Sequence, residues 1–289
     1  MSKTLSKLAA KTFQALASTP LPTKCIQLAL SASLSLVATT SFGSASFLSL
    51  TQDDYDKITK EFSGNFVHPS VSGADSLGKL FGVETSLVLG QTASPNIDSI
   101  VKRSGSSSGL SNLYDGGVLI ALTVPLGFTG EIVYVPKTTA SDASFQMTSL
   151  GLKWTASESV LILPVNLAFR GIYTSSEFSF NQTLSAANAT VTNKNTVTGL
   201  QVLVSPKLPI VEPYFGIGML SASNTLSVTG SSGTIFDSTL TTSQSSDNKA
   251  SSTQLIAGIN AKLLLFSLGA EYSKAFDASR YAVKFGFAF

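Results

Sequence analysis

The chain has 289 residues, of which 12% are charged and 43% hydrophobic, and its formal net charge is +2. The charged share is about half the roughly 25% that is usual in soluble domains. The apolar residues are nevertheless dispersed, and outside the N-terminal region no stretch is long enough for a membrane-spanning helix. The small net charge and the lack of a basic patch with interleaved aromatics give no sign of nucleic-acid binding.

The N-terminal region has the pattern of a secretory signal peptide. Residues 1–24 contain four lysines and no acidic residue, an apolar Ser-rich stretch follows, and Gly43-Ser44-Ala45 ends it with small residues. A basic region, an apolar core and a small-x-small end predict a cleaved signal over residues 1–45. The alternative is a membrane anchor, but the apolar stretch is short and diluted by serine. Cleavage after Ala45 would remove Cys25, the only cysteine, and with it any disulfide or thiolate metal site.

Residues 46–76 do not alternate and form a separate N-terminal segment. A short helix is predicted from Thr51 to Phe62, with Thr51 as the N-cap and acidic residues in the first turn. The segment is predicted to be periplasmic or plug-like, and a cap or a mobile tail is favoured over a place in a barrel mouth or on a membrane surface. An irregular strand within 63–76 would raise the strand count given below toward twelve.

Residues 77–289 are predicted to form about ten strands with alternating short and long connections. Short connections near residues 125–126, 157–159, 206–209 and 264–265 alternate with long polar ones at 92–115, 174–194 and 224–250. This asymmetry and the strand lengths are typical of an antiparallel transmembrane β-barrel with both ends on the short-turn side. A soluble β-sandwich is the alternative fold. The predicted strands are 78–90, 116–124, 127–135, 145–156, 160–173, 195–205, 210–222, 251–263, 266–275 and 280–289.

The charges in the middle of the strands lie opposite the apolar parity. In 160–173, for example, Val165, Leu167 and Phe169 share one face, and Arg170 lies on the other. A charged side chain facing lipid at the midplane costs about 2–4 kcal/mol, which explains this bias. Tyrosines at 134, 173, 272 and 281, with Trp154 and Phe289 at the other end, suggest aromatic girdles. The predicted lumen-lining residues are Glu84, Glu131, Lys153, Arg170, Glu212, Lys262, Glu271 and Lys284.

The last nine residues alternate strictly. Aromatic or aliphatic residues occupy one parity, namely Tyr281, Val283, Phe285, Phe287 and Phe289. This segment resembles the closing strand of bacterial outer-membrane β-barrels, whose terminal Phe is read by the barrel-insertion machinery. The resemblance covers about residues 78–289 in pattern and points to uncharacterised barrel families of Gram-negative bacteria. It implies an outer-membrane location, with membrane lipid and the assembly machinery as partners, and it transfers no catalytic or ligand residue.

The chemistry-bearing residues are few. His68 is the only histidine, and a catalytic role with nearby Ser70, Ser72 or Asp75 is disfavoured because it precedes the first strand. We expect no enzyme activity, no metal site and no cofactor. The expected function is a narrow channel or an uptake protein for a small solute, with a charged lumen. The alternatives are a structural or surface-interaction barrel that acts through long extracellular loops and, third, an outer-membrane lipid hydrolase. The lumen charges fit either an internal ion-pair network or a narrow pore.

Overall fold

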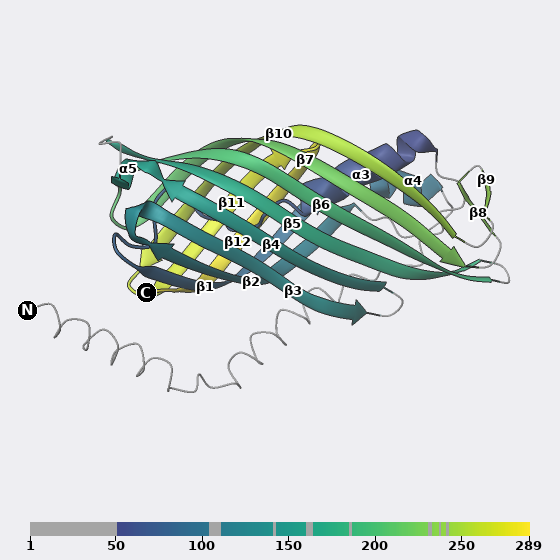
Figure 1. Cartoon of the computed structure of the whole chain (residues 1–289), viewed down its shortest axis with the longest axis horizontal. Coiled ribbons are helices and arrows are strands. Elements are labelled where there is room, and N and C mark those ends of the chain that lie inside the picture. Colours follow the sequence, from purple (N-terminus) through teal and green to yellow (C-terminus); the bar gives the residue numbers. More distant parts are fainter. Residues whose placement is uncertain are drawn as a thin grey trace, which may run out of the picture. The chain divides into compact units, whose positions relative to one another are not determined.

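The computed structural model describes residues 51–103, 111–140, 143–159, 164–184, 187–230, 233–236, 238–240 and 243–289. The predicted signal peptide, residues 1–45, lies outside these ranges. Within them, ten antiparallel strands form a closed barrel in which each strand pairs with its neighbours along the chain (Figure 1). The predicted fold class and the count of ten barrel strands are therefore confirmed. The barrel strands are β1 Gly82–Ala93, β2 Asn112–Val124, β3 Phe128–Ala140, β4 Ala143–Thr155, β5 Val165–Leu184, β6 Ala187–Pro206, β7 Val211–Gly230, β10 Ser243–Leu263, β11 Phe266–Ala275 and β12 Ala278–Ala288.

The barrel closes where β12 pairs with β1. The register runs from Glu84 opposite Ala288 to Thr92 opposite Arg280. Beyond it, the backbone N–H of Val83 donates to the Phe289 carbonyl oxygen at 2.9 Å, and Phe289 donates back at 2.8 Å. This pairing closes the sheet into a barrel, although β10 extends beyond its pairing with β11 over residues 243–254.

The connections differ at the two ends of the barrel. The end that carries η1 (Pro125–Gly127), α5 (Ala156–Ser159) and the turns at 207–210 and 264–265 is called the turn side. The opposite end, the loop side, carries α4 (Pro95–Arg103) and the small sheet of β8 (Gly233–Phe236) and β9 (Ser238–Leu240). Both Gly82 and the C-terminal strand end lie on the turn side, as predicted.

Two stretches predicted to be long loops are mostly strand. β5 and β6 remain paired up to Leu184 opposite Ala187, and β7 and β10 up to Thr229 opposite Ser243. Alternation of apolar residues ends where the outward residues become Ser, Thr and Lys, so the pattern loses its signal there. Backbone pairing needs no apolar outer face, and Thr and Val favour extended backbone. We call β5–β6 and β7–β10 the extended hairpins.

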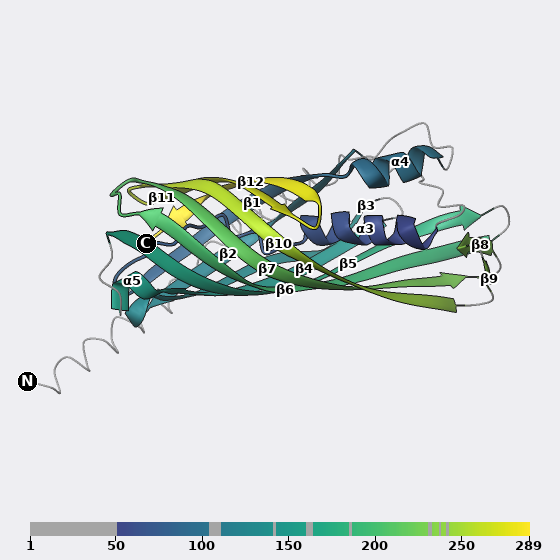
Figure 2. The same cartoon turned by 90° about the horizontal axis from the view of Figure 1, so that it is seen from above.

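In the described part of the chain, which begins at residue 51, one helix precedes the barrel. α3 spans Gln52–Asn65, and Thr51 caps it in a capping box with Asp54, which confirms the predicted short N-terminal helix. Figure 2 shows α3 among the loop-side parts of the strands. Residues 66–76 continue from it without strand structure, so they add no strand to the barrel. We call residues 66–76 the plug.

No helix in the described part of the chain is both long and apolar enough to cross a membrane.

The outer face of the barrel is apolar. Alternate residues of each strand point outward, and the large apolar ones are widely exposed. Tyrosines border this surface toward the loop side. We call this surface the apolar belt; its members include Ile120, Leu122, Ile132, Tyr134, Leu150, Leu152, Phe169, Tyr173, Leu200, Phe215, Ile217, Met219, Leu255, Ile259, Leu268, Tyr272, Tyr281, Val283 and Phe285.

Two glycines on the wall allow a test of how tightly the interior is filled. A Cβ on Gly258 would collide with the buried ring of Tyr214, whereas a Cβ on Gly130 would meet no atom within 4 Å. We therefore expect Gly258→Ala to lower the free energy of unfolding by about 1–3 kcal/mol through overpacking. Gly130→Ala should change it by no more than about 0.5 kcal/mol. Urea unfolding of both variants in detergent checks this, and equal effects would contradict a filled interior.

Candidate functional site: the filled lumen

The N-terminal segment passes along the lumen from the loop side to the turn side. α3 contacts three loop-side elements: Asp54 pairs with Arg103 of α4, Asn248 of β10 donates to Asp56 at 2.7 Å, and Lys60 approaches Asp277 at 3.2 Å. At the other end, the backbone N–H of Leu77 donates to the Thr123 hydroxyl at 3.1 Å, close to the end of β2. The segment therefore begins at the loop-side mouth and ends at the turns.

Glu61 of α3 also holds α4 in place. One of its carboxylate oxygens accepts from the backbone and side-chain amides of Asn96, and the other accepts from the backbone N–H of Ile97 at 2.9 Å. These amides belong to the first turn of α4, where a carboxylate satisfies free N–H groups and meets the positive end of the helix dipole. The two helices are thus joined at the loop-side mouth.

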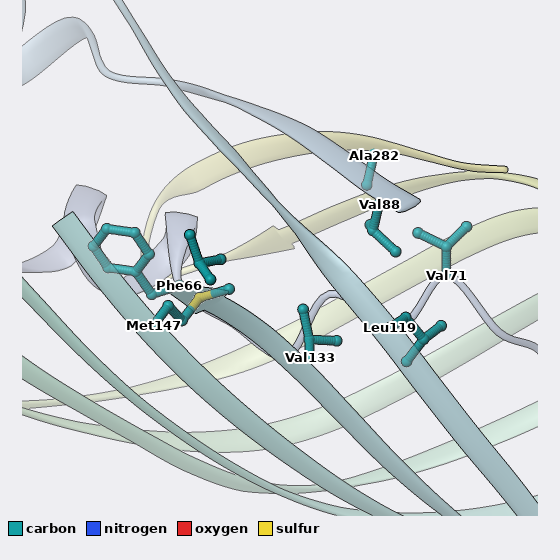
Figure 3. Packing of buried hydrophobic residues seen from close by; sticks show 8 residues of the cluster. Phe66, Val71, Val88, Leu119, Val133, Met147 and Ala282 are labelled. Carbon is teal, nitrogen blue, oxygen red and sulfur yellow. The ribbon is translucent and has the colours of Figure 1, made fainter. Parts of the chain in front are cut away.

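The plug packs against an apolar wall on one side of the barrel. Phe66 and Val71 belong to one buried cluster with side chains from β1, β2, β3, β4 and β12, shown in Figure 3. Phe66 stacks on Phe145 with 5.2 Å between ring centroids. The wall residues of this cluster are Val88, Leu119, Val133, Val135, Met147 and Ala282.

The neighbouring plug residue faces a second apolar wall. Val67 lies in a buried cluster with Ile172 of β5, Val197 of β6 and Leu220 of β7, and with Phe276 from the β11–β12 turn. Phe66 and Val67 therefore pack against different groups of strands. The lumen at this level is a hydrophobic core, and the plug supplies its centre.

Glu131 of β3 is the polar centre of the lumen. It accepts from His68 Nε2 at 2.9 Å and from the Ser72 hydroxyl at 2.8 Å, so two plug residues bind to one wall carboxylate. Arg170 lies 3.7 Å and Lys153 3.9 Å from its oxygens. Because all of these groups are buried, removal of any one leaves charge or hydrogen-bonding capacity uncompensated.

His68 also bonds to a serine, so its connectivity resembles that of a serine hydrolase triad. Nδ1 lies 2.7 Å from the Ser149 hydroxyl, and Nε2 lies on the Glu131 carboxylate. A nucleophile must reach its substrate, and it needs donors for the developing oxyanion. Ser149 and the His68 side chain are fully buried, and the Ser149 hydroxyl also bonds to Thr174. In this arrangement the relay fixes the plug to β3 and β4.

The turn-side half of the plug is held through its backbone. Lys153 donates to the carbonyl oxygens of Gly73 and Asp75, both at 2.9 Å. Glu212 accepts from the backbone N–H of Asp75 at 2.7 Å. A Cβ on Gly73 would overlap the Glu212 carboxylate, so only glycine permits this close approach. Lys262 completes the set, with its ammonium 2.9 Å from the Ser76 carbonyl and 3.5 Å from the Asp75 carboxylate.

Other charged groups connect one strand to another. Lys284 lies 2.8 Å from Glu84, as an ion pair whose angle falls outside hydrogen-bond geometry. Tyr214 donates to Glu271 at 2.8 Å. Arg170 is fixed from the other side by Gln201, which accepts from its Nε at 2.6 Å. These contacts couple wall strands to one another, and Arg170 also donates from Nη1 to the Ser72 hydroxyl of the plug at 3.2 Å.

The structure buries seven of the eight predicted lumen residues, and the side chain of Lys262 is 29% exposed. It brings Glu131 together with Lys153 and Arg170, and Glu84 with Lys284, whereas Glu212 meets the plug backbone and Glu271 meets a tyrosine. The five predicted residues of the closing segment all point outward: Tyr281, Val283, Phe285, Phe287 and Phe289.

Sequence reasoning missed a fully buried ion pair near the loop side. Arg280 donates to both oxygens of Asp115, at 2.9 and 2.8 Å. Asp115 had been placed in the connection 92–115, whereas β2 begins at Asn112, so its parity was not considered. Continuing the two-residue alternation of the predicted strand 116–124 back through Tyr114 would have placed Asp115 on the inward face.

A row of polar side chains crosses the extended hairpins and faces α3. Ser176, Asn195, Asn224 and Asn248 are successive register partners on β5, β6, β7 and β10. Asn224 donates to the Ser63 hydroxyl of α3 at 3.1 Å. The sequence offers a signal for this row in the alternate spacing of Asn193 and Asn195, but the predicted strand begins at residue 195 and leaves Asn193 in the connection 174–194.

No group of three or more His, Cys, Asp or Glu residues that could hold a metal ion occurs in the part of the chain that the structure describes. The donor set of the lumen is already occupied by ion pairs and by the plug. What the arrangement does chemically is to bind a peptide segment inside the barrel.

The family of the chain follows from a match over nearly its whole length. Residues 7–289 match the model of a family of unknown function, DUF6588. The chain belongs to this family. No curated protein matches the sequence.

Solved structures share the fold only distantly. The translocator domain of the autotransporter NalP from Neisseria meningitidis is 11% identical, with 73% of this chain and 88% of that chain covered and a TM-score of 0.40. Ail, the attachment invasion locus protein of Yersinia pestis, in complex with the heparin analogue sucrose octasulfate, is 12% identical over 73% and 99% of the chains, with a TM-score of 0.30. Neisserial surface protein A is 12% identical over 72% and 95%, with a TM-score of 0.29.

The buried Glu84–Lys284 pair allows a stability test. Lys284→Met leaves the Glu84 carboxylate buried without a cation, so the free energy of unfolding should fall by about 3–5 kcal/mol. Adding Glu84→Gln to this variant should restore a large part of the loss. The matched control is Lys60→Met, which removes the exposed pair with Asp277 and should cost no more than about 1 kcal/mol. Chemical unfolding in detergent measures all three, and equal losses for Lys284→Met and Lys60→Met would contradict a dry pair.

Proposed function

We propose that this protein is an integral barrel of the bacterial outer membrane, closed by its own plug, that acts through its loop-side surface. The observation that carries the proposal is the filled lumen, in which plug residues pack against apolar walls from both halves of the barrel. The function is thus a structural or surface-interaction role, and the extended hairpins, α4 and the β8–β9 sheet supply the surface.

The membrane part of the proposal rests on the outer face. The apolar belt surrounds the barrel while its charges lie inside, which is the arrangement that a lipid environment requires. The closing strand, with outward Tyr281, Phe285 and Phe289, supports insertion by the barrel-assembly machinery. Membrane lipid and this machinery are the proposed partners.

The proposal of a closed barrel follows from what an empty lumen would expose. Phe66, Val67 and Val71 are buried against wall residues that are themselves apolar. Each such side chain gains about 1.5–3 kcal/mol from burial, and the facing wall would lose cover as well. In a water-filled pore the wall at this level would be lined by polar side chains, whereas here it is lined by apolar ones.

A gated path for a small solute is the second candidate. It is favoured by the polar contacts of the plug, in which His68, Ser72 and the backbone of Asp75 bind to charged wall residues. Water or a polar solute can replace such contacts at a lower cost than it can replace apolar packing. In this case the plug would be the gate.

Conductance distinguishes the two candidates. In planar bilayers, the full-length protein should show no conductance steps, and Arg170→Ala should lower its stability without opening it. Val71→Glu places a charge against the apolar wall of Val88 and Leu119, so it should expel the plug and produce steps. Lys57→Gln on the exposed face of α3 is the control and should stay silent.

Steps from the unmodified protein would contradict the closed barrel and favour the solute path. Silence in Val71→Glu, with the barrel still folded by its heat-modifiable migration in gels, would show that something other than the plug closes the lumen.

The direction of the N-terminal segment predicts which face of a cell displays it. Thr51 caps α3 at the loop-side mouth, next to α4 and the upper part of β10. A peptide epitope inserted directly before Thr51 should therefore bind antibody on intact cells. The same epitope inserted into the turn at 207–210 should bind only after the outer membrane is permeabilised. Labelling of the second epitope on intact cells would reverse the proposed orientation.

A further inference from the structure

The turn side of the barrel carries large apolar side chains at positions where tight turns favour Gly, Asn and Asp. Each of them is more than half exposed, and they come from the plug–β1 connection and three different turns. We call them the turn rim: Leu80, Phe81, Leu126, Leu208, Ile210, Leu264 and Leu265.

Two members of the turn rim adopt a backbone conformation that leucine disfavours. Leu126 has φ of 72° and Leu264 has φ of 56°, both in the left-handed region. On the loop side, Phe276 has a similar φ of 52°, but its ring is buried in the cluster with Val67, which compensates for the strain. Leu264 is 99% exposed and Leu126 is 66% exposed, so their side chains, unlike that of Phe276, are not packed in a buried cluster of the described chain. These side chains are therefore available to a contact outside the protein.

The loop-side border of the apolar belt is sharp. On β7 the outward residue after Met219 is Ser221, and on β10 the outward residue before Leu255 is Thr253. Both polar residues are exposed, and serines, threonines and lysines continue outward from there. The belt cannot extend farther in this direction.

Measured from that border to the turn-side strand ends, the belt is too short for a membrane. Residues 211–219, 255–263 and 281–289 each span eight residue steps. At about 3.3 Å per step and a tilt of about 40°, eight steps rise about 20 Å. The apolar band of a transmembrane barrel is about 25 Å tall. The missing height of about 5 Å corresponds to the one or two turn-rim residues that each turn adds beyond the strand ends.

The charges beside the turn rim suit a lipid boundary. Lys79 precedes Leu80 directly, and Lys207 precedes Leu208 directly; both lysines are exposed. Long basic side chains next to apolar residues extend toward phosphate groups while the apolar residues stay in the acyl layer. On the same side, Glu158 accepts a hydrogen bond from the Ser76 hydroxyl.

From these observations we propose that the turn rim is immersed in the phospholipid leaflet on the turn side, so that the turns lie among acyl chains and not in the aqueous periplasm. The occupant of this surface is phospholipid, because the rim members extend the apolar belt at the plug–β1 connection and at three of the turns and so complete its height. The inference rests on the proposed membrane insertion and adds the depth at which the barrel sits. Lys79 and Lys207 would then contact the headgroup phosphates.

Tryptophan fluorescence in proteoliposomes tests the depth. In a Trp154→Phe background, which removes the only tryptophan, single tryptophans replace Leu208 and Leu265 in the rim. Ile259→Trp marks the middle of the belt, and Ser223→Trp marks the polar surface on the loop side. Vesicles contain phosphatidylglycerol and phosphatidylethanolamine brominated either near the headgroup or deep in the acyl chain.

Leu208→Trp and Leu265→Trp should lose fluorescence to the shallow bromines as fully as Ile259→Trp does to the deep ones, and Ser223→Trp should keep its fluorescence. Quenching of Ile259→Trp with rim tryptophans that respond only to aqueous iodide would overturn the immersion and leave the membrane barrel intact; a protein partner would then be the occupant to seek. Absence of quenching at Ile259→Trp as well would overturn the membrane barrel itself.

Discussion

The structure depends on the need to fill a ten-stranded barrel. A closed sheet of this size encloses more space than the inward-facing side chains of its own strands can fill, yet too little for a wide aqueous channel. The chain resolves this with a peptide that carries both apolar and polar side chains into the interior. Phe66, Val67 and Val71 complete hydrophobic clusters on the wall, while His68 and Ser72 satisfy Glu131. Removal of the plug would therefore uncover apolar walls and a buried carboxylate together.

The charged residues have two separate roles. Pairs such as Glu84–Lys284 and Asp115–Arg280 join wall strands, and Lys153 and Glu212 bind the plug backbone. Contacts to a backbone do not depend on plug side chains, so glycine suffices at position 73, where the Glu212 carboxylate approaches closely. The interior thus combines features of a protein core with those of a peptide-binding site whose ligand is part of the same chain.

The sequence predicted the wall far better than it predicted the contents. Alternation assigns each strand residue to the inside or the outside, because the pleat has a period of two and a charge facing lipid is costly. It assigns Arg170 and Lys284 to the interior, and the structure buries both side chains. Alternation says nothing about residues 66–76, whose conformation is set by partners distant in sequence: the Glu131 that binds His68 is 63 residues away. The extended hairpins were missed for a related reason, since their outward residues are polar and hydrophobic contrast disappears while pairing continues.

The direction of the plug constrains how the barrel is assembled. The plug is attached to the first strand at the turn side, whereas Thr51 lies at the opposite mouth, so the peptide crosses the interior once from end to end. The final pairing, between β1 and β12, joins the strand that follows the plug to the last strand of the chain. If the wall wraps around the peptide, the plug is in place before the seam closes. If the barrel closes first, residue 51 reaches the far mouth only by travelling along the unfilled interior. Seam closure and occupation of the interior are thus ordered events. A delay between them leaves the apolar wall and the apolar side chains of the plug uncovered during biogenesis.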